Sequence, residues 1–153
     1  MRRLAPALLF ALLAPGSLPA QTREETFAFL SAEIRALASK DYYIREIALS
    51  PDGQVFTFRR SVRGKADKGL VIPLAQVDIY RIVHHEPKGY EWSDIKVRTR
   101  GQDGTLTFNG QPFKGTKTLL RLIYDERKAR ALDQAFQRLI ELARGRKPAF
   151  PVP

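Results

Sequence analysis

Short segments of strand composition alternate with turn sequences between residues 41 and 124, and this pattern constrains the fold most strongly. The segments are rich in aromatic and β-branched residues, whereas glycine, proline, asparagine and aspartate gather between them. This arrangement is typical of antiparallel sheets joined by tight turns. Seven strands are predicted, over residues 42–49, 54–62, 70–72, 77–84, 92–100, 105–109 and 118–124. The pattern favours a small, strongly twisted β domain.

A helix is predicted on each side of the strand region. At the first helix, Thr22 and Glu25 form a capping box, in which each side chain satisfies a backbone N–H group of the other residue. At the second helix, Asp125 is the predicted N-cap. The apolar stripe of this second helix consists of Ala129, Leu132, Ala135, Phe136, Leu139, Ile140 and Ala143. The fold class is therefore α+β, with one domain over 41–147 and the helix of 21–40 packed outside it.

The first twenty residues have the pattern of a secretory signal peptide. Two arginines precede an apolar run over residues 4–14, and Ala20 is a small residue suited to cleavage before Gln21. The alternative is an uncleaved anchor, but a membrane-spanning helix needs about 20 apolar residues. We therefore expect export into the periplasm or the medium. The proline-rich residues 148–153 form a tail, because alternate prolines suit neither a helix nor a central strand.

The chain is basic and contains no cysteine. It has 26 Lys and Arg against 16 Asp and Glu, and removal of the two arginines of the signal peptide lowers the net charge from +10 to +8. The absence of cysteine excludes disulfides, thiolate metal sites and a cysteine nucleophile. For an exported protein, the positive charge points away from nucleic acid and toward anionic lipids, acidic glycans or an acidic protein.

The order of seven short antiparallel strands followed by one amphipathic helix resembles the pleckstrin-homology superfold, over residues 41–144. The resemblance implies a partly open barrel that is capped by the C-terminal helix, with the N-terminal helix as an extra element. Members that hold inositol phosphates use a long basic loop between their first two strands, but the turn at 50–53 contains no lysine or arginine. Phe136 stands in place of the tryptophan that the family usually has in its terminal helix. The phosphoinositide site is therefore not carried over.

The chain also resembles a loose set of small exported bacterial proteins, of the type found in Bacteroidota. The similarity lies in the E-x-T-hydrophobic start of the first helix and in apolar positions of the second helix. The residues that carry it are Glu24, Glu25, Thr26, Phe27 and Leu30, together with Ala129, Leu132, Ala135, Phe136 and Leu139. This resemblance implies no activity for the chain.

Two groups of basic residues form the candidate binding site. The first group is Arg59, Arg60, Arg63, Lys65 and Lys68, and the second is the same-face ladder of Lys96, Arg98 and Arg100. If the two strands faced the same side, these residues would attract a polyanion with a steep salt dependence. Tyr90 and Trp92 would flank the surface as aromatic contacts, and the alternative for Trp92 is a place in the core or at the barrel rim.

The sequence does not contain a complete set of residues for catalysis or for metal binding. His84 and Glu86 share a strand face, but His85 is the only other histidine, so no metal or cofactor is predicted. Ser61 and Ser93 lie outside any nucleophile elbow, and the carboxylates follow no glycosidase spacing. The chain is therefore expected not to be an enzyme.

The sequence thus predicts an exported, monomeric or weakly associating, noncatalytic binding or scaffold module of unknown specificity, which uses no cofactor and whose partner is an unknown protein or an anionic envelope component. The alternative is a module that binds an anionic envelope surface, an acidic lipid or glycan, through a basic strand face. A third possibility is a small apolar cavity, whose lining would be Phe56, Phe58, Tyr80, Phe108 and Phe113. Nucleic acid is not an expected partner, and no membrane-spanning segment is expected in the mature chain.

Overall fold

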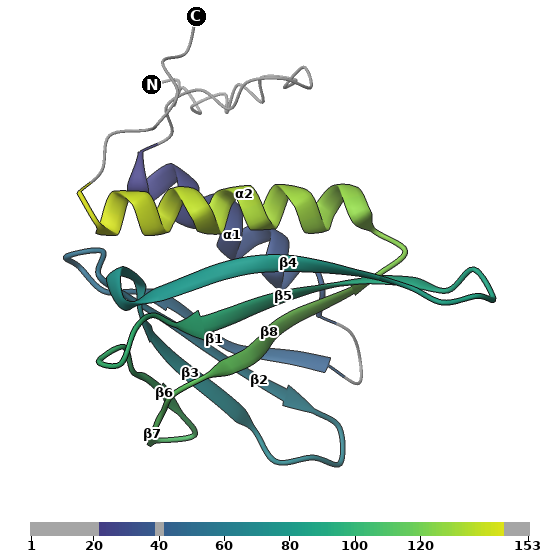
Figure 1. The fold of residues 1–153 in the computed structure, drawn as a ribbon, viewed down its shortest axis with the longest axis horizontal. Coiled ribbons are helices and arrows are strands. Elements are labelled where there is room, and N and C mark those ends of the chain that lie inside the picture. Colours follow the sequence, from purple (N-terminus) through teal and green to yellow (C-terminus); the bar gives the residue numbers. More distant parts are fainter. Residues whose placement is uncertain (1–21, 39–41, 146–153) are drawn as a thin grey trace, which may run out of the picture.

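The computed structural model describes residues 22–38 and 42–145, which form two helices and eight antiparallel strands (Figure 1). The strands make a five-stranded sheet of order β1-β2-β3-β6-β7 and a three-stranded sheet of order β4-β5-β8, which do not close into a barrel. The elements are α1 (Arg23–Arg35), β1 (Tyr42–Leu49), β2 (Val55–Val62), β3 (Lys68–Pro73), the 3-10 helix η1 (Leu74–Gln76), β4 (Val77–His85), β5 (Glu91–Thr99), β6 (Leu106–Phe108), β7 (Gln111–Phe113), β8 (Thr116–Ile123) and α2 (Glu126–Ala143). The predicted signal peptide and the tail of 148–153 lie outside the described residues.

The α+β class is confirmed, and the strand count is eight rather than seven. The additional strand is β7, which lies in a segment that the sequence assigns to a loop. It pairs with β6 through the turn at Asn109 and Gly110, whose φ angles of 50° and 80° suit a two-residue hairpin turn. Strands of three residues are too short to show the alternation of apolar and polar side chains, so the Asn-Gly turn is the one sequence signal for this hairpin.

Both predicted helix caps are present in the structure. Thr22 Oγ1 accepts a hydrogen bond from the backbone N–H of Glu25 at 3.2 Å, and Glu25 Oε2 accepts one from the N–H of Thr22 at 2.9 Å. Asp125 Oδ1 accepts from the N–H of Lys128 at 3.0 Å. These bonds satisfy N–H groups that the first turn of a helix leaves without partners. Among the described residues, no helix is both long and apolar enough to cross a membrane.

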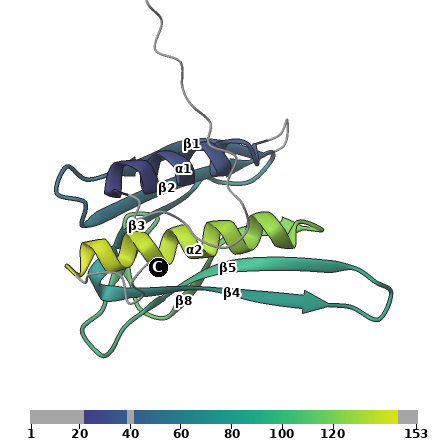
Figure 2. The same ribbon diagram turned by 90° about the horizontal axis from the view of Figure 1, so that it is seen from above.

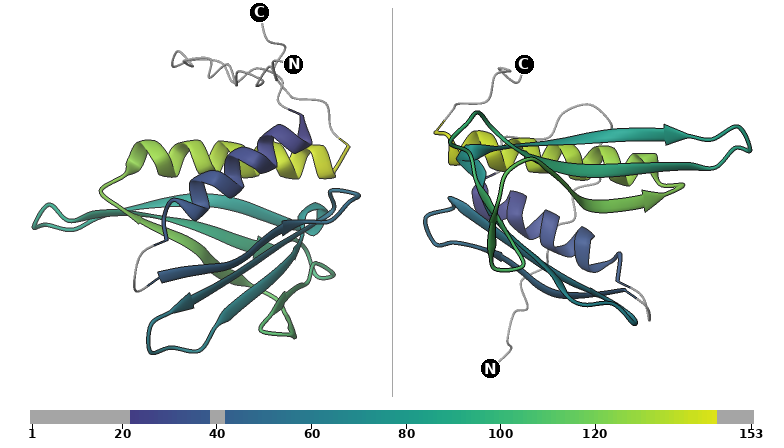
Figure 3. Two further views of the ribbon diagram at one scale, coloured as in Figure 1. Left: turned by 180° about the vertical axis from the view of Figure 1, so that it is seen from behind. Right: turned by 60° about the horizontal axis from the view of Figure 1, so that its bottom comes forward.

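The two helices lie along one end of the sheets, with α1 over β1 and β2 and α2 along the three-stranded sheet (Figures 2 and 3). Phe56 of β2 is the centre of the core, with ring centroids 5.5 Å from Phe136 of α2 and 6.4 Å from Phe27 of α1. Leu30 and Ile34 of α1 are completely buried in the same core. The expectation that α1 packs outside the domain is therefore wrong, because its apolar stripe covers part of the common core.

The two sheets separate at the end where α2 begins. Strands β2 and β8 diverge toward their C-terminal ends (Figure 1), and no ladder joins the two sheets there. The core side chains fill the space under the helices, and beyond them the divergence leaves an opening between the sheets. This opening holds the candidate functional site.

Candidate functional site

A cleft of about 510 Å³ lies between the ends of β2, β3 and β8. Its basic lining residues are Arg60, Lys65, Lys68 and Arg121, and Asp125 is the single acidic residue of the lining among the described residues. Apolar side chains, including Tyr42, Val62 and Ile123, complete the wall. The volume is in the range of small-ligand sites, and the charge of the lining suits an anionic group.

Strand periodicity aims two of these basic residues into the cleft. Arg60 follows Phe56 and Phe58 at intervals of two, and it therefore lies on the face of β2 that points into the core. Its cross-strand partner is Lys68, which precedes the buried Leu70 at the same interval on β3. The two side chains thus extend the core face to the point where the apolar core ends and the cleft begins.

Arg121 comes from the other sheet and is held by a buried carboxylate. Its Nε donates to Asp94 Oδ1 at 2.7 Å and its Nη2 donates to Asp94 Oδ2 at 3.1 Å. The Asp94 side chain is only 3% exposed, although it lies on the outer face of the three-stranded sheet. A β-bulge at Leu119 shifts the register between β5 and β8, and this shift places Arg121 directly opposite Asp94.

Asp94 is ionised in this setting. Burial raises the pKa of Asp94. The hydrogen bond and the charge of Arg121, with smaller effects from His84 and Lys96, lower this pKa by more than burial raises it, so that the net shift is downward. The hydrogen bond to Asp94 in turn raises the pKa of Arg121. The pair therefore fixes the Arg121 guanidinium on the outer face of the three-stranded sheet, next to the edge strand β8 that lines the cleft.

An aromatic shelf, which we define as Tyr90, Trp92 and Tyr124, lies beside Arg121. The Tyr90 ring lies 5.5 Å from Trp92 and 5.2 Å from Tyr124 between centroids, and Arg121 Cζ lies 5.6 Å from the centre of the Trp92 ring. The exposed fraction is 37% for Tyr90 and 65% for Tyr124. His84 stacks on Trp92 at 4.7 Å, with 10° between the ring planes. The two predicted aromatic residues are therefore grouped at the surface next to Arg121.

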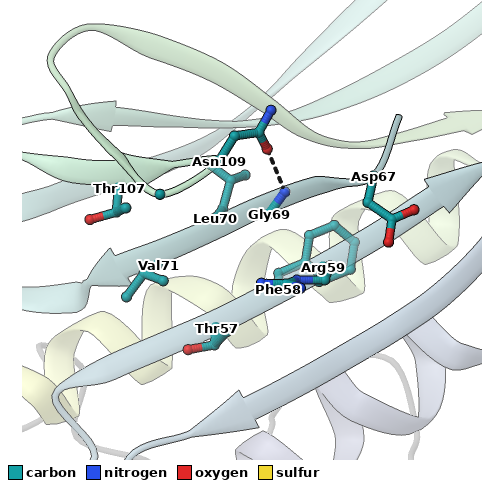
Figure 4. Close-up of a pocket in the computed structure, with 10 residues that line it drawn as sticks. Thr57, Phe58, Arg59, Asp67, Gly69, Leu70, Val71, Thr107 and Asn109 are labelled. Atoms are coloured by element: carbon teal, nitrogen blue, oxygen red, sulfur yellow. Dashed lines mark hydrogen bonds between the residues drawn. The ribbon is translucent and has the colours of Figure 1, made fainter. Parts of the chain in front are cut away.

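The structure divides the eight predicted basic residues among separate places. Arg60, Lys65 and Lys68 line the cleft, and Arg63 lies in the turn after β2. Arg59 points to the opposite face of β2, where it lines a second hollow of about 350 Å³ with Asp67 (Figure 4). In that hollow the backbone N–H of Gly69 donates to Asn109 Oδ1 at 2.8 Å, a bond that ties β3 to the β6–β7 hairpin.

The predicted ladder on β5 lies on the outer face of the three-stranded sheet. Its two arginines gather on Asp78, whose carboxylate lies 3.7 Å from Arg98 Nη2 and 3.4 Å from Arg100 Nε, and Arg144 at the end of α2 adds Nη2 at 3.4 Å. Lys96 is partly buried and stands opposite Tyr80 on β4. Because these arginines already share a carboxylate, they are weaker candidates for an external anion than the residues of the cleft.

The two adjacent histidines are directed to separate carboxylates on β5. His84 Nε2 lies 3.3 Å from Asp94 Oδ2, whereas His85 Nδ1 lies 2.9 Å from Glu91 Oε2. Residues 22–38 and 42–145 contain no cluster of three or more His, Cys, Asp or Glu side chains placed to hold a metal ion. The histidines therefore act here as partners of acidic residues.

Sequence reasoning did not identify the Asp94–Arg121 pair as part of a site. The available signal was a charged residue within an apolar strand, since Arg121 interrupts the run from Leu119 to Ile123. A lone charge at such a position needs a partner when its strand is half-buried. Which residue pairs with Arg121 depends on the bulge at Leu119, and no local sequence motif predicts this bulge.

We expect the substitution Asp94→Asn to destabilise the protein in a pH-dependent manner. A lowered pKa means that the ionised carboxylate stabilises the fold above the ordinary aspartate pKa of about 3.9, and that this stabilisation disappears as the pH falls through the folded-state pKa. The expected loss at pH 7 is about 2 kcal/mol, the scale of hydrogen bonds to charged groups. Urea denaturation of both proteins at pH 7 and at pH 3 measures it, and an equal difference at the two pH values would contradict the assignment.

The comparisons with known proteins give no family for this chain, and its role must be argued from the site itself. No family model, no curated protein and no solved structure matches it.

Proposed function

We propose that the chain is an exported, noncatalytic binding module of pleckstrin-homology-like architecture, and that it binds an anionic group in the cleft between β2 and β8. The observation that carries the proposal is the convergence of Arg60, Lys65, Lys68 and Arg121, from both sheets, on one opening. Asp125 offsets only part of their charge. Carboxylate, phosphate and sulfate groups all fit this lining, because each accepts several N–H donors.

Arg121 is suited to a second anion. Asp94 accepts hydrogen bonds from Nε and Nη2, and a guanidinium carries five N–H donors, so that further N–H groups can donate to a ligand. The buried carboxylate fixes the orientation of the guanidinium before any ligand arrives, which reduces the entropy lost on binding. Lys65 and Lys68 lie on and beside the turn that follows β2 and supply flexible positive charge on the opposite wall.

Binding to anionic targets tests this proposal with two variants of equal charge. The variant K65Q/K68Q removes two charges from the cleft, and R98Q/R100Q removes two from the outer face of the three-stranded sheet. We expect K65Q/K68Q to weaken binding about tenfold or more, since each charge-assisted contact contributes roughly 1 kcal/mol, whereas R98Q/R100Q should retain nearly full affinity. Co-sedimentation with phosphatidylglycerol vesicles and affinity for oligogalacturonate, each over a range of salt concentrations, provide the measurements.

The outcomes separate the possible sources of the anion. Retention on vesicles alone identifies an acidic lipid, and retention on oligogalacturonate alone identifies an acidic glycan. Absence of binding to both targets at low salt would refute the proposal and favour a protein partner. An equal effect of both variants would show that diffuse surface charge, and not the cleft, is responsible.

A further inference from the structure

We propose, on the basis of the anion-binding function above, that the aromatic shelf binds the sugar rings of an acidic polysaccharide whose acidic groups enter the cleft. The shelf and the cleft adjoin each other along β8. Ile123 lines the cleft and is the cross-strand partner of Trp92, and Arg121 lines the cleft while its guanidinium lies over the Trp92 ring. A chain molecule placed along this edge of the sheet would contact both features at once.

The chemistry of the shelf fits a sugar better than an acyl chain. A sugar ring has C–H faces that pack on aromatic faces, and it has hydroxyl groups around its rim that need hydrogen-bonding partners. The shelf provides both, because its two tyrosines have phenolic hydroxyls and Arg121 adds N–H donors beside the indole. An acyl chain would have to leave these polar groups without partners, which is unfavourable.

The shelf is held in place before a ligand binds. His84 stacks on Trp92, and Trp92 Nε1 is buried without a hydrogen-bond partner among the described residues, so stacking positions the indole. Tyr124 has a φ of 54°, which is rare for a bulky residue and concentrates at functional sites. Its N–H donates to the carbonyl of Glu91 at 3.1 Å, and this bond holds the strained residue against the start of β5.

The positive charge of the cleft favours a sugar that carries an acidic group. A neutral polysaccharide would offer no opposite charge to Arg60, Lys65 and Lys68 of the cleft. A uronic acid presents a ring and a carboxylate in each unit, so that one unit can stack on the shelf while the carboxylate of a neighbouring unit enters the cleft. The charge of the cleft and the shape of the shelf therefore favour the same ligand class.

Trp92 is the only tryptophan of the chain, which makes its fluorescence a local reporter of the shelf. Titration with oligogalacturonate is expected to change the emission of Trp92 and to protect it from acrylamide quenching. Polyglutamate, which presents carboxylates without sugar rings, should bind the cleft without this protection.

The variant Y124N removes one ring and retains a residue that tolerates positive φ. It should lower the affinity for oligogalacturonate about fivefold to tenfold, the scale of one aromatic contact, and leave the affinity for polyglutamate unchanged.

The control is Y43N, which removes an exposed tyrosine of β1 and should leave both affinities unchanged. Equal effects of Y124N on oligogalacturonate and polyglutamate, or an unchanged Trp92 signal at saturation, would overturn the role of the shelf and leave the cleft proposal standing. A preference for phosphatidylglycerol vesicles that depends on Tyr124 would overturn it in favour of a lipid. If K65Q/K68Q also retains full affinity for both soluble probes, the proposed function itself fails. Thermal melting of each variant confirms that the fold is intact.

Discussion

Replacing Phe136 by alanine is expected to lower the free energy of unfolding by about 4 kcal/mol, which is in the range for a large aromatic residue of a close-packed core. Phe136 is completely buried, and its ring meets Phe56 edge to face at 5.5 Å. It thereby joins α2, which lies along the three-stranded sheet, to β2 of the five-stranded sheet. Because Phe136 lies where α2 meets β2 inside the common core, the cavity left by the ring would weaken the attachment of the two sheets to each other.

Urea denaturation provides the measurement, with Val71→Ala as the control. Val71 is 40% exposed on β3, so its truncation should change the free energy of unfolding by less than about 0.5 kcal/mol. A loss below about 1 kcal/mol for F136A would contradict the close packing between Phe56 and Phe136. A two-phase unfolding curve would show instead that the sheets unfold separately.

The helices and the longer strands could be predicted because each is long enough to show its period. The apolar stripe of α2 and the capping box of α1 appear in the structure as the sequence indicates. The place of α1 could not be predicted in the same way, since a one-sided apolar stripe does not say which surface covers it. Leu30 and Ile34 complete the common core, and this depends on α2 and β1 being in place.

The candidate site could also be predicted only in part from sequence periodicity. The alternation of Phe56, Phe58 and Arg60 already indicates that Arg60 shares the core face of β2 and that Arg59 does not. The pairing of Asp94 with Arg121 depends on strand register, and a shift of one residue at Leu119 decides it. Sequence periodicity fixes the face of a side chain within a strand, whereas only the assembled sheet determines its neighbours across strands.

Gly104→Ala is expected to destabilise the protein by about 3 kcal/mol, at the upper end for overpacking of a tight site. An added Cβ would lie 2.2 Å from the Arg100 carbonyl oxygen and 2.9 Å from that of Gln76, and both are backbone atoms that a side-chain rotation cannot move. The same atoms hold the junction of the two sheets, since Arg100 N donates to the Gln76 carbonyl at 2.9 Å and Gly104 N donates to the Arg100 carbonyl at 3.0 Å. Relief of the clash would break this linkage between β5 and η1.

Gly101→Ala is the matched control for this prediction, because it lies in the same turn and has open space around it. Its φ of 59° disfavours alanine, so the expected loss is about 1 kcal/mol, caused by backbone strain alone. Denaturant unfolding of G104A and G101A under the same conditions gives the loss in free energy of unfolding for each variant. The comparison separates the effect of a steric clash from that of backbone strain at two positions of the same turn. A loss for G104A no larger than that for G101A would mean that the junction between the sheets yields to a methyl group, and that the approach of Gly104 to Arg100 and Gln76 does not hold the sheets together.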